Sequence, residues 1–232
     1  MSDHVRRAAS ADARGPIARS PIAPAPPVAA VAGWEVSARR SDADLTVTDL
    51  TPLAKVQVKA PWDGALAGTL GGPFGRAERS ASFEDAEGDD EDVLVVGSGP
   101  GEWLALGSPG TAPDLVERLE RLAARLPNPE FVTVVDLTHG RALIRIAGER
   151  TPDLLAKVCG IDLGETVTPN GAAFRSSVAR LAVDVVRYDR DGTRSYLLHC
   201  ERSSGQYLFD ALLDAGGEFG AEIDGFVEPG LS

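Results

Sequence analysis

The chain has 232 residues, of which 43% are hydrophobic and 25% are charged, a composition that is ordinary for a globular protein with a substantial core. Its formal net charge of −12 argues against a nucleic-acid partner, because such proteins neutralise phosphates with clustered Lys and Arg. No stretch approaches the ~20 uninterrupted apolar residues that a membrane helix needs, so we expect no membrane association. The two cysteines, Cys159 and Cys200, lack metal-ligand spacing and favour a reducing, cytoplasmic setting.

Local composition divides the chain into three parts. Residues 1–40 are rich in Ala and Pro and are predicted to form a disordered extension, because prolines break the helix that a transit peptide would need. Residues 41–220 are predicted to form one folded domain, and 221–232 a tail without a strong signal. Within the domain, residues 84–92 hold seven acids in nine positions. We interpret this run as a solvated, flexible loop, since it lacks the ligand spacing of a calcium-binding EF-hand.

The first half of the predicted domain contains strands, a hairpin and a helix. Alternating apolar residues predict strands at 45–48 and 54–59, and the glycine-rich stretch that follows predicts a loop with a short strand at 65–70. Residues 93–107 read as two strands joined by glycines. A nucleotide-binding loop is disfavoured there, because G-x-G-x-x-G would need glycine where Glu102 stands and a strand follows in place of a helix. Leucines at helical spacing predict an amphipathic helix over 113–126.

The second half has the clearest local signals. The sequence predicts strands at 132–135, 142–147, 173–179, 182–188 and 195–200. A short helix is predicted from Thr151 as its cap to a left-handed stop at Gly160, and a last helix from Ser203 as its cap to Gly216. This order indicates an α+β fold, a mainly antiparallel sheet with helices on one face, in an arrangement that also allows two ferredoxin-like halves.

No catalytic site is predicted, and no cofactor or metal site, because the sequence has neither a G-x-S-x-G nor an H-E-x-x-H motif. His139 lies in a turn and could act as a general base, but a structural role in the turn is the preferred interpretation. His199 and Cys200 are not expected to form a nucleophile–base pair, because strand neighbours point to opposite faces. Arg202 and Ser203 favour a capped helix start over an anion site.

Residues 131–163 carry a recurrent pattern, with supporting segments upstream at 101–106 and downstream at 202–204 and 209–215. The residues of the pattern are Asp136, Thr138, Gly140, Arg141, Gly148, Leu155, Ala156, Lys157, Cys159, Asp162 and Leu163. In these residues the chain resembles the gamma subunit of heterotetrameric sarcosine oxidase, over roughly residues 45 to 219.

The resemblance implies a fold like the folate-binding domain of aminomethyltransferases and a non-catalytic role in assembly. The implied complex oxidises sarcosine to glycine and gives peroxide with 5,10-methylenetetrahydrofolate or formaldehyde. Its alpha, beta and delta subunits are the implied partners, alpha most directly. They would carry the cofactors, which are FAD, FMN, NAD, tetrahydrofolate and zinc, and none is expected on this chain.

A subunit of this kind is expected to expose an apolar patch when isolated, and Trp34, Trp62 and Trp103 are the candidate anchors. The residues singled out as partner contacts are Trp103, His139, Arg141 and Arg202. The main alternative is a stand-alone protein that binds folate or another small ligand in a closed pocket. A further alternative is a related subunit that serves another N-methyl amine.

Overall fold

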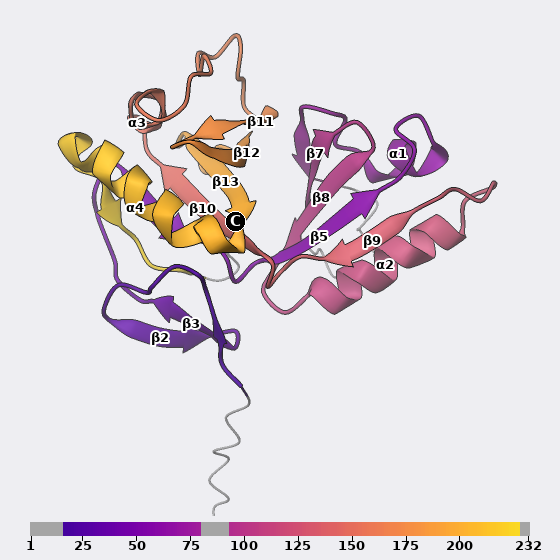
Figure 1. Cartoon of the computed structure of the whole chain (residues 1–232), viewed down its shortest axis with the longest axis horizontal. Helices are drawn as coiled ribbons and strands as arrows, with labels where there is room; N and C mark the ends of the chain where they lie inside the picture. Colours follow the sequence, from indigo (N-terminus) through magenta and orange to yellow (C-terminus); the bar gives the residue numbers. More distant parts are fainter. Residues whose placement is uncertain (1–15, 80–92, 228–232) are drawn as a thin grey trace, which may run out of the picture.

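Two β-sheets with helices on their outer faces form the body of the protein (Figure 1). The computed structural model describes residues 16–79 and 93–227. The first sheet has five strands and is accompanied by helices α1 (Ala65–Leu70) and α2 (Ala112–Ala124). In spatial order its strands are β6 (Ala77–Arg79), β7 (Leu94–Gly99), β8 (Glu102–Gly107), β5 (Ala54–Lys59) and β9 (Thr133–Asp136).

The second sheet has six strands and is accompanied by helices α3 (Thr151–Ala156) and α4 (Gly205–Gly216). All its ladders are antiparallel except the pair of its last two strands. In spatial order the strands are β11 (Ala173–Val178), β12 (Leu181–Arg187), β13 (Ser195–Glu201), β10 (Arg141–Ala147), β4 (Thr46–Asp49) and β14 (Glu222–Ile223).

The two sheets repeat one topology, that of two ferredoxin-like halves. In the first half, β7, β8, β5 and β9 stand side by side with the connectivity of a β-α-β-β-α-β unit, and β6 is added at the edge. In the second half, β12, β13 and β10 take the equivalent places, with β11 at the edge. The fourth place is held by β4, which precedes the first half in the chain. The predicted fold class is therefore confirmed, and the fourth strand of the second half comes from the chain before the first half.

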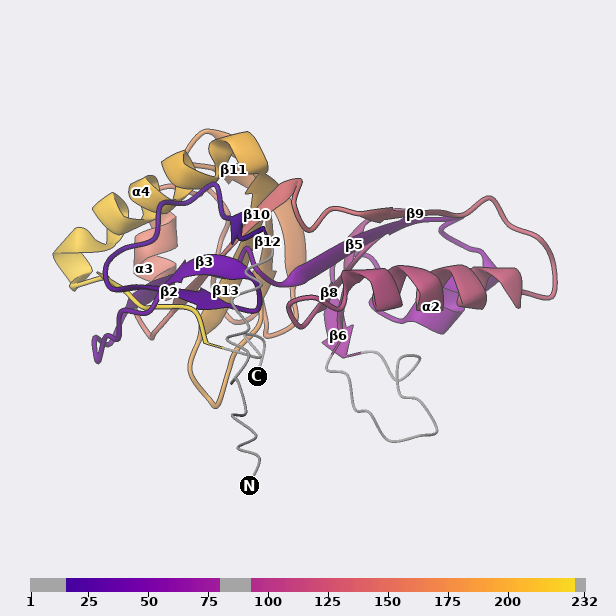
Figure 2. The same cartoon turned by 90° about the horizontal axis from the view of Figure 1, so that it is seen from below.

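Apolar side chains form three cores that correspond to the layers. One core lies between the second sheet and α3 and α4, and another between the first sheet and α1 and α2. Figure 2 shows α2 running along the β5–β9 pair. The third core, called here the inner core, joins the opposite faces of the two sheets through Leu104 and Leu106 on β8, Leu143 on β10 and Leu197 on β13. Each sheet therefore buries both of its faces.

The predicted disordered extension is wrong for residues 16–40. They form β1 (Ala18–Arg19), β2 (Val28–Val31) and β3 (Trp34–Ser37), a small sheet that packs on the inner core. Prolines exclude helix but tolerate extended chain at sheet edges. The side chains of Ile22 and Trp34 are only 2% and 4% exposed, which supplies the burial that composition did not reveal.

The predicted tail is also wrong where the chain is described. β14 pairs in parallel with β4, and Phe226 is buried in the inner core. The acidic loop predicted at 84–92 lies outside the described residues. Among the residues that are described, no helix is long and apolar enough to cross a membrane.

Most predicted elements are confirmed within two residues, and the errors concern α1 and the helix ends. Residues 65–70 form a helix and not a strand, because Leu66 and Leu70 share one buried face and the Glu130 carboxylate accepts the free amide of Ala65 at 2.6 Å. Neither Thr151 nor Ser203 caps its helix with its side chain. Gly160 does not have the left-handed conformation expected of a helix stop.

Replacement of Trp34 tests whether the small N-terminal sheet is part of the folded domain. We expect Trp34→Ala to lower the free energy of unfolding by about 3–5 kcal/mol, the usual cost of truncating a buried aromatic side chain. The matched control is Trp62→Ala, whose side chain is 71% exposed and whose loss should change stability by no more than ~0.5 kcal/mol. Urea denaturation of both variants measures the difference, and equal effects would contradict burial of Trp34.

Candidate functional site

Two chain segments cross from one sheet to the other side by side, and together they are called here the crossover. Residues 49–55 lead from β4 to β5, and residues 136–141 lead from β9 to β10. The Lys55 amide donates to Thr138 Oγ1 at 3.0 Å, and the Leu137 amide donates to the Lys55 carbonyl at 2.7 Å. The crossover is thus a hydrogen-bonded unit that fixes how the halves meet.

Lys55 is fully buried in the crossover. Its Nζ donates to the carbonyl oxygens of Thr51 at 2.6 Å and Leu53 at 2.7 Å. Burial lowers the pKa of Lys55 to about 7, although the carboxylates of Asp49 and Asp136 act in the opposite direction. Burial likewise raises the pKa of Asp49, against the hydrogen bonds from Ser20 and Thr51. A strongly shifted lysine can mark a catalytic site, but here both bonds of the ammonium close the local chain, which indicates a structural role.

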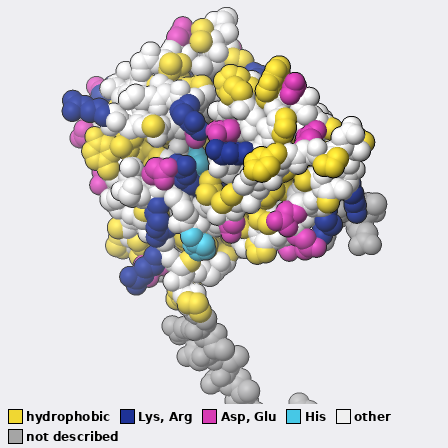
Figure 3. Space-filling view, turned by 45° about the vertical axis from the view of Figure 1, so that its right-hand side comes forward, with side chains coloured by type: hydrophobic (Ala, Val, Ile, Leu, Met, Phe, Trp, Pro, Cys, Tyr) yellow, Lys and Arg dark blue, Asp and Glu magenta, His cyan; other side chains and the backbone are white. Residues whose placement is uncertain are grey.

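A network of charged side chains runs from the second sheet to the first near the crossover. Arg175 donates to both oxygens of Asp184, through Nε at 2.6 Å and Nη2 at 3.3 Å. His199 Nδ1 lies 3.5 Å from the same carboxylate. Arg175 also lies 3.8 Å from Glu102 on the first sheet, and Glu102 pairs with Lys59 at 2.8 Å. Figure 3 shows side chains of both charges gathered in the middle of this face.

Asp184 orients the imidazole ring of His199, but no described residue provides a nucleophile for this ring to activate. Burial lowers the pKa of His199, and the nearby Arg141 and Lys55 lower it further, while Asp184 opposes them. For Asp184 burial raises the pKa, but the hydrogen bonds from His199 and Arg175 outweigh it and the net pKa is below its ordinary value. The second ring nitrogen of His199, Nε2, is buried without a partner. No nucleophile therefore reaches this imidazole from the described part of the chain.

The cysteines and acidic residues supply no alternative chemistry among the residues described. Cys200 faces the core under α4, opposite to His199, as the strand alternation predicted. Burial raises the pKa of its thiol to about 11, which makes thiolate chemistry unfavourable. Cys159 is also free and buried. In the described ranges, no group of three or more His, Cys, Asp or Glu residues could hold a metal ion.

The structure brings three of the four predicted partner contacts together. His139 and Arg141 flank the β9–β10 connection, and Arg202 Nη1 donates to the His139 carbonyl oxygen at 3.3 Å. The His139 ring stacks on Trp34 with centroids 4.8 Å apart, and Arg141 pairs with Glu201 at 2.5 Å. The His139 ring therefore contacts Trp34, which is distant in the chain, and not the local backbone of the turn.

Trp103 does not belong with the other three residues. It is 5% exposed, lies in the other half, and donates from Nε1 to the Gly72 carbonyl oxygen at 3.1 Å. The expectation that Trp103 anchors a partner is therefore wrong for the chain in this structure. Trp34 is also buried, so only Trp62 of the three candidate anchors is exposed.

Sequence reasoning missed the buried charges. Lys55 falls within an alternating strand, whose polar positions were expected to face solvent, whereas the second sheet covers that face. Arg145 stands alone in an apolar strand, and such an interruption is the signal that could have found it. Asp184 and Arg175 carry no comparable signal, because their pairing depends on the register of β11 with β12.

The shifted pKa of Lys55 predicts a pH-dependent stability. Between pH ~7 and ~10.5 the unfolded chain binds a proton at Lys55 that the folded chain does not, so the free energy of unfolding rises with pH across this window. One such proton contributes at most ~1.4 kcal/mol per pH unit. We expect Lys55→Met to reduce this slope in urea titrations. Lys59→Met, on the exposed end of the same strand, controls for the lost charge, and a wild-type slope in Lys55→Met would contradict the prediction.

Comparison with known proteins shows the family. The sequence model of the GCVT N-terminal domain matches residues 28–226. An aminomethyltransferase of Saccharopolyspora erythraea is 26% identical over 182 residues, which are 74% of this chain and 47% of that protein. The chain therefore spans about half the length of this curated relative.

Two solved structures share the fold. A chain of the heterotetrameric sarcosine oxidase of Corynebacterium sp. U-96, in complex with pyrrole 2-carboxylate, superposes with a TM-score of 0.61 at 22% identity, over 80% of this chain and 90% of that one. Aminomethyltransferase T of the glycine cleavage system of Bartonella henselae superposes with a TM-score of 0.67 at 16% identity, over 85% and 55%. The fold and the match over most of its length show that the chain belongs to the GCVT N-terminal domain family.

Proposed function

We propose that this chain is a non-catalytic gamma-type subunit of a heterotetrameric sarcosine oxidase. The observation that carries the proposal is the structural match to a chain of heterotetrameric sarcosine oxidase, which extends over 80% of this chain and 90% of that one. In this role it docks on the alpha subunit, while beta and delta complete the complex. Flavin, nicotinamide, folate and zinc sites lie on those partners.

The described residues are consistent with an assembly role. His199 and Asp184 form an oriented pair without a nucleophile, and both thiols are buried. The charged network joins the two sheets and so holds the halves in one orientation, which is what a docking subunit requires. In the complex, oxidation of sarcosine to glycine and transfer of the one-carbon unit take place on the larger subunits.

Exposed aromatic side chains at one end of the first sheet provide a docking surface, called here the aromatic end. It consists of Trp62 and Phe131, which are 71% and 87% exposed. They are neighbours because β5 and β9 pair up to Lys59 and Thr133, and because Glu130 binds the amide of Ala65. Exposed aromatic residues of this size are typical anchors of protein interfaces.

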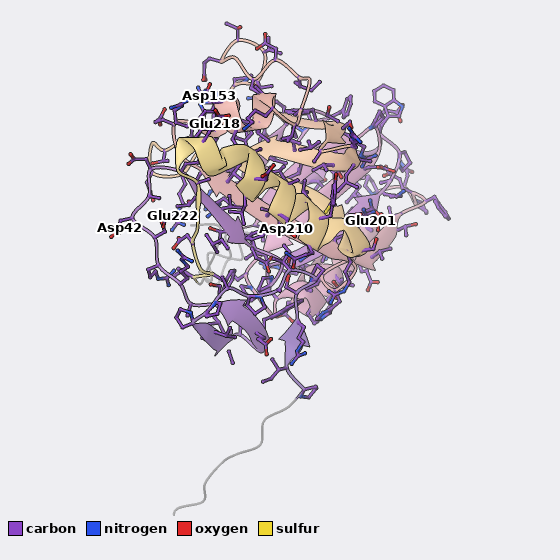
Figure 4. The ribbon with its side chains drawn as sticks, turned by 60° about the vertical axis from the view of Figure 1, so that its left-hand side comes forward. Asp42, Asp153, Glu201, Asp210, Glu218 and Glu222 are labelled. Carbon is purple, nitrogen blue, oxygen red and sulfur yellow. The ribbon has the colours of Figure 1, made fainter. Side chains whose placement is uncertain are left out.

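The opposite half presents a different surface. Figure 4 shows Asp210 on the outer side of α4, Glu201 near one end of that helix, and Glu218 and Asp153 near the other end. Glu201, Asp153 and Glu218 pair with Arg141, Arg150 and Lys157, so ion pairs cover this surface. Acidic and lysine side chains are depleted at interface centres. Docking is therefore assigned to the first half, through the aromatic end.

Affinity capture of the tagged chain from its native organism tests the proposal. We expect the eluate to contain a large flavoprotein and to absorb near 450 nm, because the partner subunits would carry the flavins. A colourless eluate that contains this chain alone would contradict it. Titration of the isolated chain with folates then tests the alternative of a stand-alone binding protein.

Substitutions at the aromatic end test the docking surface. We expect Trp62→Ser together with Phe131→Ser to reduce recovery of the flavoprotein at least tenfold, since interface anchors usually contribute 2 kcal/mol or more each. Phe74→Ser is the matched control, because Phe74 is 65% exposed and precedes β6 at the other edge of the same sheet. Equal recovery with both variants would place the interface elsewhere, and circular dichroism verifies that each variant is folded.

A further inference from the structure

A cavity of about 230 Å³ lies in the second half, away from the aromatic end and from the charged network. It is formed by β4, β10, the turn between β12 and β13, and the chain that follows β14. Its charged lining residues are Arg145, Arg190, Asp191 and Asp224, and its hydroxyl-bearing lining residues are Thr46, Thr48, Thr193 and Ser195.

Arg145 is buried in the wall of this cavity without an acidic partner among the described residues. Arg145 is 5% exposed, and its Nε and Nη2 atoms are both buried without a hydrogen-bond acceptor. Burial, together with the charge of Arg190, lowers the pKa of Arg145 to about 10. Both carboxylates that line the cavity are engaged elsewhere. Asp224 accepts the Ser41 amide at 3.2 Å, and Asp191 lies 3.5 Å from Arg190. An enclosed cation with unused donors is costly unless an anion compensates it.

The two unused donors of Arg145 form one edge of the guanidinium group. The same edge binds a carboxylate at two other places in this protein. Arg175 uses Nε and Nη2 for the two oxygens of Asp184, at 2.6 and 3.3 Å, and Arg187 uses them for Asp189, at 3.1 and 2.8 Å. This two-point geometry matches a carboxylate and distinguishes it from spherical anions. Arg145 presents the same Nε–Nη2 edge, but no carboxylate of the described residues pairs with it.

We propose that the cavity binds a small carboxylate, which pairs with the Nε–Nη2 edge of Arg145. Ser195 Oγ, which is buried without a partner, and the Thr48 hydroxyl supply further polar contacts. The volume suits a small organic acid, since a cavity of about 150 Å³ already holds benzene. Nε and Nη2 of Arg145 and Oγ of Ser195 are buried beneath the cavity surface in this structure, so the proposal requires both side chains to turn toward the cavity on binding. This site is independent of the proposed subunit role.

Thermal unfolding of the full-length isolated chain tests the site with acetate and propionate as probes. Ionic strength is held constant with NaCl, acetamide serves as the neutral analogue, and phosphate as a different oxyanion. We expect both carboxylates to raise Tm, by about 5 °C at one hundred times Kd, and acetamide to leave it unchanged. No response to either carboxylate, or an equal response to acetamide, would overturn the proposal. Stabilisation by phosphate alone would overturn the assignment to carboxylates.

Variants locate the response. We expect Arg145→Met to abolish the shift in Tm while the protein without ligand stays at least as stable as the wild type, because an uncompensated buried charge is removed. Arg145→Lys keeps the charge without the Nε–Nη2 edge and should weaken binding at least tenfold. Arg125→Met, at the exposed end of α2, is the control and should respond like the wild type.

A second substitution covers the case in which Arg145 variants do not fold. Ser195→Ala should weaken acetate binding about tenfold through the loss of one hydrogen bond to a charged group. An unchanged acetate response in Ser195→Ala and in any folded Arg145 variant would exclude this cavity. Because no partner subunit takes part, these results do not depend on whether the chain assembles with a flavoprotein.

Discussion

The crossover is the constraint on which the arrangement of the two halves depends. Four strands enter or leave it, and the two links lie so close that Lys55 bonds to both, through its own backbone to Thr138 and Leu137 and through its ammonium to Thr51 and Leu53. Buried backbone groups must find partners, and each link supplies those of the other. The halves therefore cannot separate without exposing a buried lysine and several carbonyl groups.

The space between the two sheets contains both apolar and charged side chains. With helices on only one face of each sheet, the other faces must bury against each other, and the inner core does this with leucines. Toward Arg175 and Glu102 the side chains are only partly buried, and there ion pairs replace apolar contacts. Burying a charged group away from water is costly. The charged side chains therefore lie where the space between the sheets is partly exposed, and the leucines lie where it is closed.

Local pattern predicted most of the fold because most elements carry a pattern of apolar residues that is visible in the sequence. Helix α2 has apolar residues at helical spacing, β5 alternates, and β10 is a continuous apolar run that is buried on both faces. Residues 16–40 were missed because their burial comes from contacts distant in the chain, such as Trp34 on His139. Helix α1 was missed because its six residues are few and contain Gly68, while Glu130, 65 residues away, satisfies its first amide.

The candidate sites were harder to predict than the fold, since they consist of pairings between strands. Asp184 meets His199 because β12 and β13 place the two residues directly opposite each other in register. Arg145 meets a cavity because β4 and the chain after β14 arrive beside β10 from the two ends of the sequence. The spacing of residues along the sequence predicts neither of these two contacts. The signal that the sequence does contain is a charged residue, Arg145, within an apolar strand.

The two halves share a topology but not a surface, and this difference favours the first half as the docking side. In the second sheet, β4 and β14 extend the edge beside β10, and the small sheet of β1, β3 and β2 packs against the inner core. In the first sheet, β9 is the last strand, with Val135 40% exposed, and among the described residues no strand pairs with its outer side. An open edge strand next to exposed aromatic residues is a surface that natural proteins usually cover. β4 thus completes the second half, whereas the first half ends at β9, and we propose that this edge faces the partner.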